Sequence, residues 1–131
     1  MPELLWYESP NGRTEARNKY LNGSDDFKAN FDISVLYLSN QERDLWSRPE
    51  YAKLKKCKYD FYEIRFFSDN TQQRPIGFWK NENEFIILLM ATEKDRKLIP
   101  KNWCDTASDR RSKIIDGTAK TKSVVDDITE Q

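Results

Sequence analysis

Three sheet-like segments follow one another between residues 59 and 97, and they constrain the fold more than any other part of the chain. They read YDFYEIRFFS, TQQRPIGFWK and EFIILLMATEK, so arginine and lysine interrupt an otherwise apolar and aromatic pattern. Because side chains alternate between the two faces of a strand, Arg65 must lie on the face opposite Ile64 and Phe66. The segments predict a three-stranded meander with cations on one face, which suits anion binding.

The turn between the first two segments decides whether Arg65 and Arg74 lie side by side. A two-residue turn at Asp69 and Asn70, residue types that tolerate a positive φ, pairs position 68 with 71 and puts Arg65 directly across from Arg74. A three-residue turn shifts the register by one and sends Arg74 to the face opposite Arg65, which matches the apolar residues better. The sequence leaves both registers open, and we favour the first.

Length and composition indicate one soluble domain. The chain has 131 residues, of which 34% are charged and 13% aromatic, enough for a substantial core. Its longest apolar run, residues 85–91, is too short to span a bilayer, and the N-terminus does not resemble a secretion signal. We therefore expect a cytoplasmic protein without a membrane partner. In that reducing compartment, Cys57 and Cys104 would be free thiols, and they match no metal-binding spacing.

The charges are unevenly distributed along the chain. Its formal net charge is zero, but residues 43–113 contain 16 Lys and Arg against 11 Asp and Glu, a net charge of +5 that the remaining residues balance. Such an asymmetry is compatible with local contact to phosphates. The plainer interpretation is a solvated surface of mixed charge.

Helical patterns precede the meander. Residues 13–21 and the segment from Ser24 to residue 40 predict two helices separated by a turn, and Ser24 is a good N-cap for the second. The sequence Ser47-Arg48-Pro49-Glu50 resembles a capping box, so we expect a short helix that continues to residue 54. A short strand over residues 4–7 comes before these helices.

A last helix is predicted over residues 103–116, where Gly117 would end it. The order of strand, helices, meander and closing helix predicts an α+β fold, with helices packed against one sheet. We expect a single domain over residues 1–117. Residues 118–131 have few large apolar groups and would form a C-terminal tail, frayed or free to act as a contact arm.

Several of these segments together resemble the RelE/HigB-type toxin superfamily, most closely its phage-derived HigB-like branch. The similarity covers most of the chain and rests on the order and spacing of residues 62–66, residues 74–78, residues 87–89, Lys94, Lys97, Pro100 and Ala107. It implies the small RelE/ParE fold, in which a helical hairpin packs on an antiparallel sheet of about four strands with a C-terminal helix.

The resemblance also implies a function. Members are toxins of type II toxin–antitoxin systems that cleave mRNA, commonly on the ribosome, and a small antitoxin protein, often of the helix-turn-helix type, silences them. These mRNA interferases are endoribonucleases that use no metal or cofactor and direct a ribose 2′-hydroxyl onto the adjacent phosphate. Guanidinium and ammonium groups would stabilise the charge that develops on that phosphate.

The family's basic positions fall on identifiable residues of this chain. Arg65 and Arg74 match those on the second and third strands. Lys94 and Lys97 lie where the family places its basic residues after the last strand, and Arg96 could take either role or bind RNA. The plainer interpretation of Arg65 is a sheet-surface residue paired with an acidic neighbour such as Glu63.

The chain departs from the family in its proton-transfer groups. It contains no histidine, and no tyrosine follows Tyr62, so two acid/base groups used by members are absent. Glu63 stands where some members have lysine and would act either as a general base or as a charge partner that orients Arg65. The alternative function is a catalytically silent binding protein, a topoisomerase inhibitor like ParE-type relatives or a phage interaction protein.

Further contacts to RNA are predicted next to the first sheet segment. Basic residues gather there, with Tyr59 or Phe61 as a base-stacking surface, and a solvated helix end is the plainer interpretation. Apolar residues on the cationic face would suit antitoxin docking. The basic residues are Lys53, Lys55, Lys56 and Lys58, and the apolar residues are Phe61, Phe67, Ile76 and Phe78.

Overall fold

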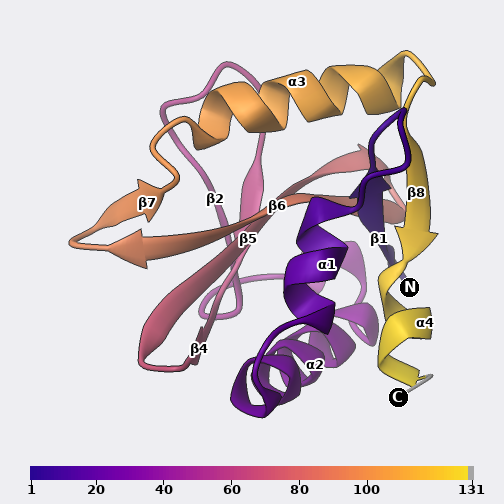
Figure 1. Cartoon of the computed structure of the whole chain (residues 1–131). Helices are drawn as coiled ribbons and strands as arrows, with labels where there is room; N and C mark the ends of the chain where they lie inside the picture. Colours follow the sequence, from indigo (N-terminus) through magenta and orange to yellow (C-terminus); the bar gives the residue numbers. More distant parts are fainter. Residues whose placement is uncertain (130–131) are drawn as a thin grey trace.

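The computed structural model describes residues 1–129, which form one eight-stranded mixed sheet and four α-helices (Figure 1). None of these helices has the length and apolar character needed to cross a membrane. The sheet order is β2-β3-β5-β6-β1-β8, with β4 paired to β5 and β7 paired to β6. In chain order the elements are β1 (Glu3–Glu8), α1 (Glu15–Leu21), α2 (Asp25–Ser39), a 3₁₀ helix η1 (Arg43–Leu45), β2 (Tyr51–Lys53), β3 (Tyr62–Ile64), β4 (Phe66–Ser68), β5 (Thr71–Asn81), β6 (Glu84–Lys94), β7 (Lys97–Ile99), α3 (Trp103–Ile115), β8 (Lys120–Ser123) and α4 (Val124–Thr129).

The sheet separates two apolar cores, because alternate side chains of its central strands point to opposite faces. Trp6 and Ile87 lie in the core under α1 and α2, whereas their neighbours Tyr7 and Ile86 lie in the core under α3. Figure 1 shows α3 on one side of the sheet and the α1–α2 pair on the other. The molecule is therefore a three-layer arrangement of helix, sheet and helices.

Strand β6 is central to this arrangement. It pairs antiparallel with β5 and parallel with β1, and its residues from Phe85 to Ala91 are buried on both faces. Double-sided burial explains why this segment is continuously apolar instead of alternating.

A β-bulge in the β5–β6 ladder positions α3. The register shifts between Ile76 and Gly77, which leaves Leu88 without a partner across the ladder. A Cβ at position 77 would overlap the carbonyl oxygen of Ile86, so glycine is required there. The carbonyl of the bulged Leu88 accepts a hydrogen bond of 2.7 Å from Nη1 of Arg110 on α3.

The α+β class, the helical pair and the closing helix agree with expectation, but the predicted RelE-like fold with an antiparallel sheet of about four strands is wrong. The sheet has eight strands and is mixed, because β1 runs parallel to β6. A tight turn at Asp95 and Arg96, with φ of 52° and 65°, folds β7 back onto β6. Strands β2 and β8 extend the sheet at its two ends.

The short helix predicted after Ser47 is instead the edge strand β2. Tyr51 pairs with Ile64 and its ring stacks on that of Tyr62, with 5.2 Å between the ring centroids. Cross-strand aromatic contacts of this kind favour the extended conformation, and they outweigh the capping-box pattern.

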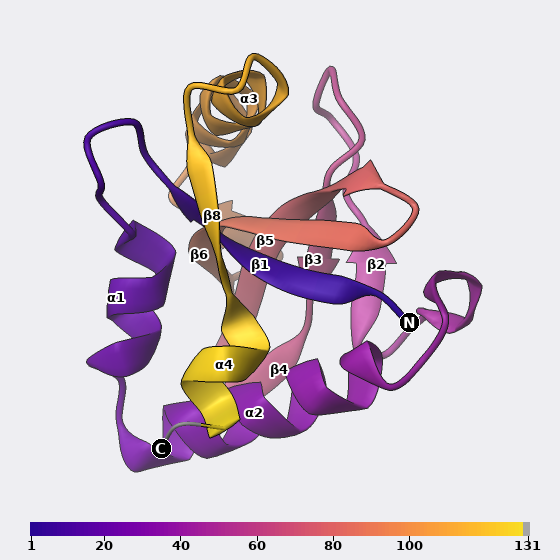
Figure 2. The ribbon, with the colours of Figure 1, turned by 90° about the vertical axis from the view of Figure 1, so that its right-hand side faces the viewer.

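Residues beyond 118 pack on the domain where we expected a tail that can fray. Strand β8 pairs antiparallel with β1, and α4 then lies beside α2 (Figure 2). The buried carboxylate of Asp127 accepts a 2.8 Å hydrogen bond from the indole nitrogen of Trp6 and pairs with Arg17 at 2.8 Å. Residues 130 and 131 of the expected tail lie outside the described residues.

Candidate nucleic-acid interface

The two central arginines are placed by a tight turn. Asp69 and Asn70 both have positive φ, 50° and 57°, and Ser68 pairs with Thr71, so the register that we favoured is correct. The same register continues in β3, where Glu63 pairs with Ile76. The ladder is interrupted between β3 and β4, but Arg65 still lies across from Arg74, as this register requires.

These arginines form an ionic cluster with Glu63, in which Glu63 and Arg74 are buried and the Arg65 side chain is 26% exposed. Oε2 of Glu63 lies 3.1 Å from Nε of Arg65 and 3.3 Å from Nε of Arg74, although neither Nε–H is aligned for a hydrogen bond. Arg74 is only 3% exposed. Its terminal nitrogens donate to the carbonyl of Gln73 at 2.8 Å and to the side chain of Gln72 at 2.9 Å. Both terminal nitrogens of the Arg74 guanidinium are therefore engaged within the protein, although its Nε–H is not.

Burial determines the protonation properties of this cluster. It raises the pKa of Glu63 above its ordinary value of 4.5, although Arg74 and Arg65 act in the opposite direction. Burial likewise lowers the pKa of Arg74, which Glu63 opposes. Oε1 of Glu93 lies 3.7 Å from Nε of Arg74. Two cations and two carboxylates thus form an electrically balanced group.

A groove of about 480 Å³ opens above this cluster on the α3 side of the sheet. Three segments form its walls: the β2–β3 loop, the β6–β7 hairpin and the chain that enters α3. Five predicted site residues line it, together with six that were not predicted. The lining residues are Lys55, Lys56, Glu63, Arg96 and Lys97 from the prediction, and Leu54, Glu93, Leu98, Lys101, Trp103 and Cys104 in addition.

The rim of the groove carries cations without acidic partners. Within residues 1–129, none of the five rim cations forms an ion pair, and the two lining carboxylates already face arginine in the cluster below. This arrangement produces a positive potential that attracts polyanions. The rim cations are Lys55, Lys56, Arg96, Lys97 and Lys101.

A disulfide fixes two walls of the groove. We expected free thiols, but the structure joins Cys57 in the β2–β3 loop to Cys104 in the first turn of α3, with 5.8 Å between their Cα atoms. The bond holds the loop that carries Lys55 and Lys56 against the segment that carries Lys101. A sequence separation of 47 residues gives no local signal for such a pair.

The other predicted site residues lie away from the groove lining. Arg65 and Arg74 belong to the ionic cluster. Lys94 is the register partner of Lys97 across the β6–β7 hairpin but does not line the groove. Lys53 pairs with the exposed Asp60 at 3.3 Å, and Lys58 lines a separate hollow with Tyr59.

The apolar docking patch that we predicted on this face does not exist. Phe61, Ile76 and Phe78 are buried in the core that α3 covers, and of the four predicted residues only Phe67, at 53%, is exposed. Strand alternation places side chains on a face but does not reveal which helix covers that face.

Two lining residues carry chemistry that the sequence did not bring out. Trp103 is half-buried and meets Phe61 edge to face, with 6.4 Å between the ring centroids, so part of its indole remains at the groove. Lys101 lies between β7 and α3, and its place at the groove follows from the path of the chain after β7. A second hollow, of about 560 Å³, is lined by Glu42, Asp44 and Glu82 and is unsuited to a polyanion.

Comparisons of the chain with family models, with curated proteins and with solved structures found no match.

Proposed function

We propose that this protein is the toxin component of a type II toxin–antitoxin system and cleaves mRNA bound in the groove above Glu63. The observation that carries the proposal is the set of five rim cations that have no acidic partner within residues 1–129. They come from three separate segments around the ionic cluster of Glu63, Arg65, Arg74 and Glu93. The resemblance to RelE/HigB-type toxins supplies the activity class.

Single-stranded RNA fits the chemistry of the groove. Ammonium and guanidinium groups on the rim would contact successive phosphates, and the exposed part of the Trp103 indole would stack against an unpaired base. Lys94 and Lys97 face each other across a hairpin, where like charges repel. A bound phosphate would relieve that repulsion.

Cleavage would proceed by attack of a ribose 2′-oxygen on the adjacent phosphorus, with departure of the 5′-oxygen and formation of a 2′,3′-cyclic phosphate. Lys97 and Arg96 would stabilise the charge on the phosphorus oxygens. Glu63 lines the groove, and its raised pKa makes it a stronger base than an ordinary glutamate, so we assign it the 2′-hydroxyl proton. A rim lysine would protonate the leaving oxygen.

Arg65 and Arg74 take a different role from the one that the resemblance implies. Arg74 is buried, and its guanidinium nitrogens already bind neighbouring side-chain and backbone groups. We therefore assign Arg74 to positioning Glu63 beneath the groove, and we assign Arg65 the same role because its Nε lies 3.1 Å from the same carboxylate oxygen. Action on mRNA would place the protein in the cytoplasm.

The second candidate is a binding protein that does not cleave RNA. It is favoured by the inward orientation of Arg74 and by the absence of histidine from the sequence. Under this alternative the groove would still hold a polyanion, but no proton transfer would follow.

Induction in a bacterial host separates the two candidates. Growth and transcript ends would be followed after expression of the wild type, Lys97→Gln and the matched control Lys19→Gln, which removes an exposed charge from α1. Arrest with new internal mRNA ends in the wild type and control, but not in Lys97→Gln, is the expected result. Arrest without new ends would indicate the binding protein, and absence of arrest would contradict the toxin assignment.

A further inference from the structure

A third hollow, of about 340 Å³, takes part of its lining from the same β2–β3 loop as the groove. Both cations and aromatic rings line it, whereas the lining of the groove combines its cations with the single aromatic ring of Trp103. It is lined by Arg43, Lys58, Tyr59, Asp60, Tyr62, Phe78, Trp79 and Arg111.

The cations of this hollow are stacked on its rings. The guanidinium carbon of Arg111 lies 4.2 Å from the ring centroid of Tyr59, and that of Arg43 lies 4.4 Å from the centroid of Trp79. Nζ of Lys58 is 5.5 Å from the Tyr59 centroid. Cation–π contacts at these distances hold the guanidinium groups at the rings, and guanidinium N–H groups bind phosphate well.

Two of these cations, Lys58 and Arg111, have no acidic partner in the described part of the chain. Arg43 pairs with Glu82 at 3.1 Å, and the single carboxylate in the lining, Asp60, pairs with Lys53. Among the ion pairs within residues 1–129, none includes Lys58 or Arg111. The hollow therefore keeps a positive charge next to half-buried aromatic rings.

The groove and the hollow share their supporting elements. The β2–β3 loop contributes Lys55 and Lys56 to the groove and Lys58 to the hollow. Helix α3 contributes Trp103 to the groove and Arg111 to the hollow, about 12 Å further along the helix axis. A short single-stranded RNA can therefore reach from the groove to the hollow. The acidic hollow around Glu42, Asp44 and Glu82 adjoins the far end of this path and would repel further phosphates.

We propose that this hollow is a nucleotide subsite that binds an unpaired base and phosphate of the RNA strand held in the groove. Arg111, whose guanidinium carbon lies over both the Tyr59 ring at 4.2 Å and the Phe78 ring at 5.7 Å, donates its N–H groups to the phosphate together with Lys58, and the base stacks on the half-buried Tyr59 ring. The inference rests on RNA binding in the groove, and it extends the binding path by a defined base-stacking position.

Binding of labelled single-stranded RNA to the purified full chain tests this subsite. Oligomers of about four and about ten nucleotides would be compared by fluorescence anisotropy, together with a long oligomer whose terminal nucleotides lack bases. The wild type should bind the long oligomer about tenfold more tightly than the short one, because an aromatic stacking contact is worth this much. Removal of the terminal bases should abolish most of the gain.

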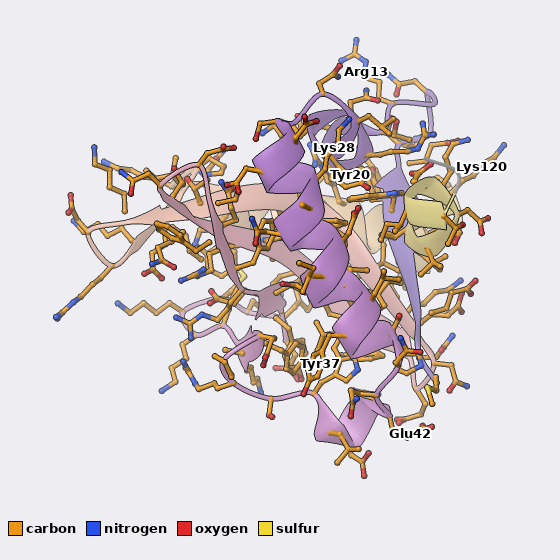
Figure 3. The ribbon with its side chains drawn as sticks, turned by 90° about the horizontal axis from the view of Figure 1, so that it is seen from below. Arg13, Tyr20, Lys28, Tyr37, Glu42 and Lys120 are labelled. Atoms are coloured by element: carbon orange, nitrogen blue, oxygen red, sulfur yellow. A yellow bond between two sulfur atoms is a disulfide. The ribbon has the colours of Figure 1, made fainter. Side chains whose placement is uncertain are left out.

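Variants assign the gain to the hollow. Tyr59→Leu and Arg111→Gln should lose it and bind both lengths alike, whereas Tyr59→Phe should retain it. Tyr37→Leu is the matched control, because Tyr37 is half-exposed on α2, on the opposite side of the sheet (Figure 3). Unfolding curves would confirm that each variant is folded.

The possible failures are distinguishable. If Tyr59→Leu and Arg111→Gln keep the full length-dependent gain while Lys97→Gln binds both lengths more weakly, the subsite is wrong and the groove stands. If the wild type binds neither oligomer, or if Lys97→Gln binds both as tightly as the wild type, RNA binding in the groove is wrong, and the subsite falls with it.

Discussion

Two groups of cations lie beneath and around the groove, and they differ in burial and in their acidic partners. The arginines at positions 65 and 74 sit beneath the groove against Glu63, with Arg74 almost completely buried. The rim cations, exemplified by Lys97, are exposed and have no acidic partner within residues 1–129.

The difference shows that the kind of residue does not determine its role. A buried cation must be paired and hydrogen-bonded, since its desolvation is otherwise too costly. Its contacts then stabilise the fold and are not available to a ligand. An exposed cation retains its hydration and can exchange water for a phosphate. The ionic cluster therefore stabilises the sheet beneath the groove, and the rim cations are available for the ligand.

The largest effect should separate these two groups by stability. Arg74→Met removes a buried charge, its two hydrogen bonds and the contact with Glu63, and should lower the free energy of unfolding by about 3–5 kcal/mol. Lys97→Met, on the exposed rim, should change it by less than about 0.5 kcal/mol. Urea titrations of both variants provide the measurement.

Equally small losses of unfolding free energy in the two variants would show that the contacts of Arg74 do not stabilise the fold as the geometry indicates. The contrast would then disappear, and Arg74 would again be a candidate for contact with phosphate. Arg74→Lys distinguishes charge from geometry, because lysine keeps the charge but not the planar fork that bonds to Gln72 and Gln73.

The disulfide should have the next largest effect. Replacement of both Cys57 and Cys104 by serine releases a loop of 47 residues and should lower the free energy of unfolding by about 2–4 kcal/mol. A dithiol reductant should destabilise the wild type to the same extent and leave the serine variant unchanged. RNA affinity should fall as well, since the loop that carries Lys55 and Lys56 is then free to move away from α3.

A wild type that is insensitive to reductant would contradict this assignment, provided that thiol titration shows the bond to be broken. Equal RNA affinity before and after reduction would show that the groove keeps its shape without the bond.

Local chemistry predicted much of the fold. Asp69 and Asn70 determined the hairpin register, Ser24 caps α2 by accepting a 3.0 Å hydrogen bond from the backbone of Phe27, and Gly117, with φ of 82°, follows the end of α3. Each of these features depends on residues within a few positions. Such signals are readable in a single sequence.

The errors in the predicted fold arose where pairing partners are distant. Strand β8 has the polar sequence KTKS and is a strand only because β1, more than 110 residues earlier, offers it a free edge. The link between Cys57 and Cys104 is equally remote from any local pattern.

The sequence predicted which kinds of residue form the candidate site, but it did not predict which of them are exposed. Alternation placed Arg65 and Arg74 on the correct face, and pairing of Arg65 with Glu63 was recognised as the plainer interpretation. Burial of Arg74 depends on contacts with Glu63 of β3 and Glu93 of β6, which a local sequence pattern does not specify. Lys101 and Trp103 were missed because the path of the chain into α3 follows from β7, a strand that was not predicted.

The smallest effect concerns the pH dependence of unfolding. Burial raises the pKa of Glu63 in the folded protein, so the folded state holds this proton more tightly than the unfolded chain does. The resulting stability is fully present below the ordinary value of 4.5 and is lost as the pH rises through the raised pKa. Glu63→Gln cannot lose a proton, so the wild type should become less stable relative to this variant as the pH rises.

Urea unfolding at a series of pH values measures this difference, with Glu3→Gln as a control at an exposed position of β1. Groups common to both proteins, such as Tyr51, whose pKa burial raises to about 12, cancel in the subtraction. Arg74 lowers the pKa of Glu63, so in Arg74→Met the loss of stability should move to higher pH. Superimposable profiles for the wild type and Glu63→Gln would mean that the arginines fully offset the effect of burial, and Glu63 would then be an ordinary carboxylate and a poor choice for the base.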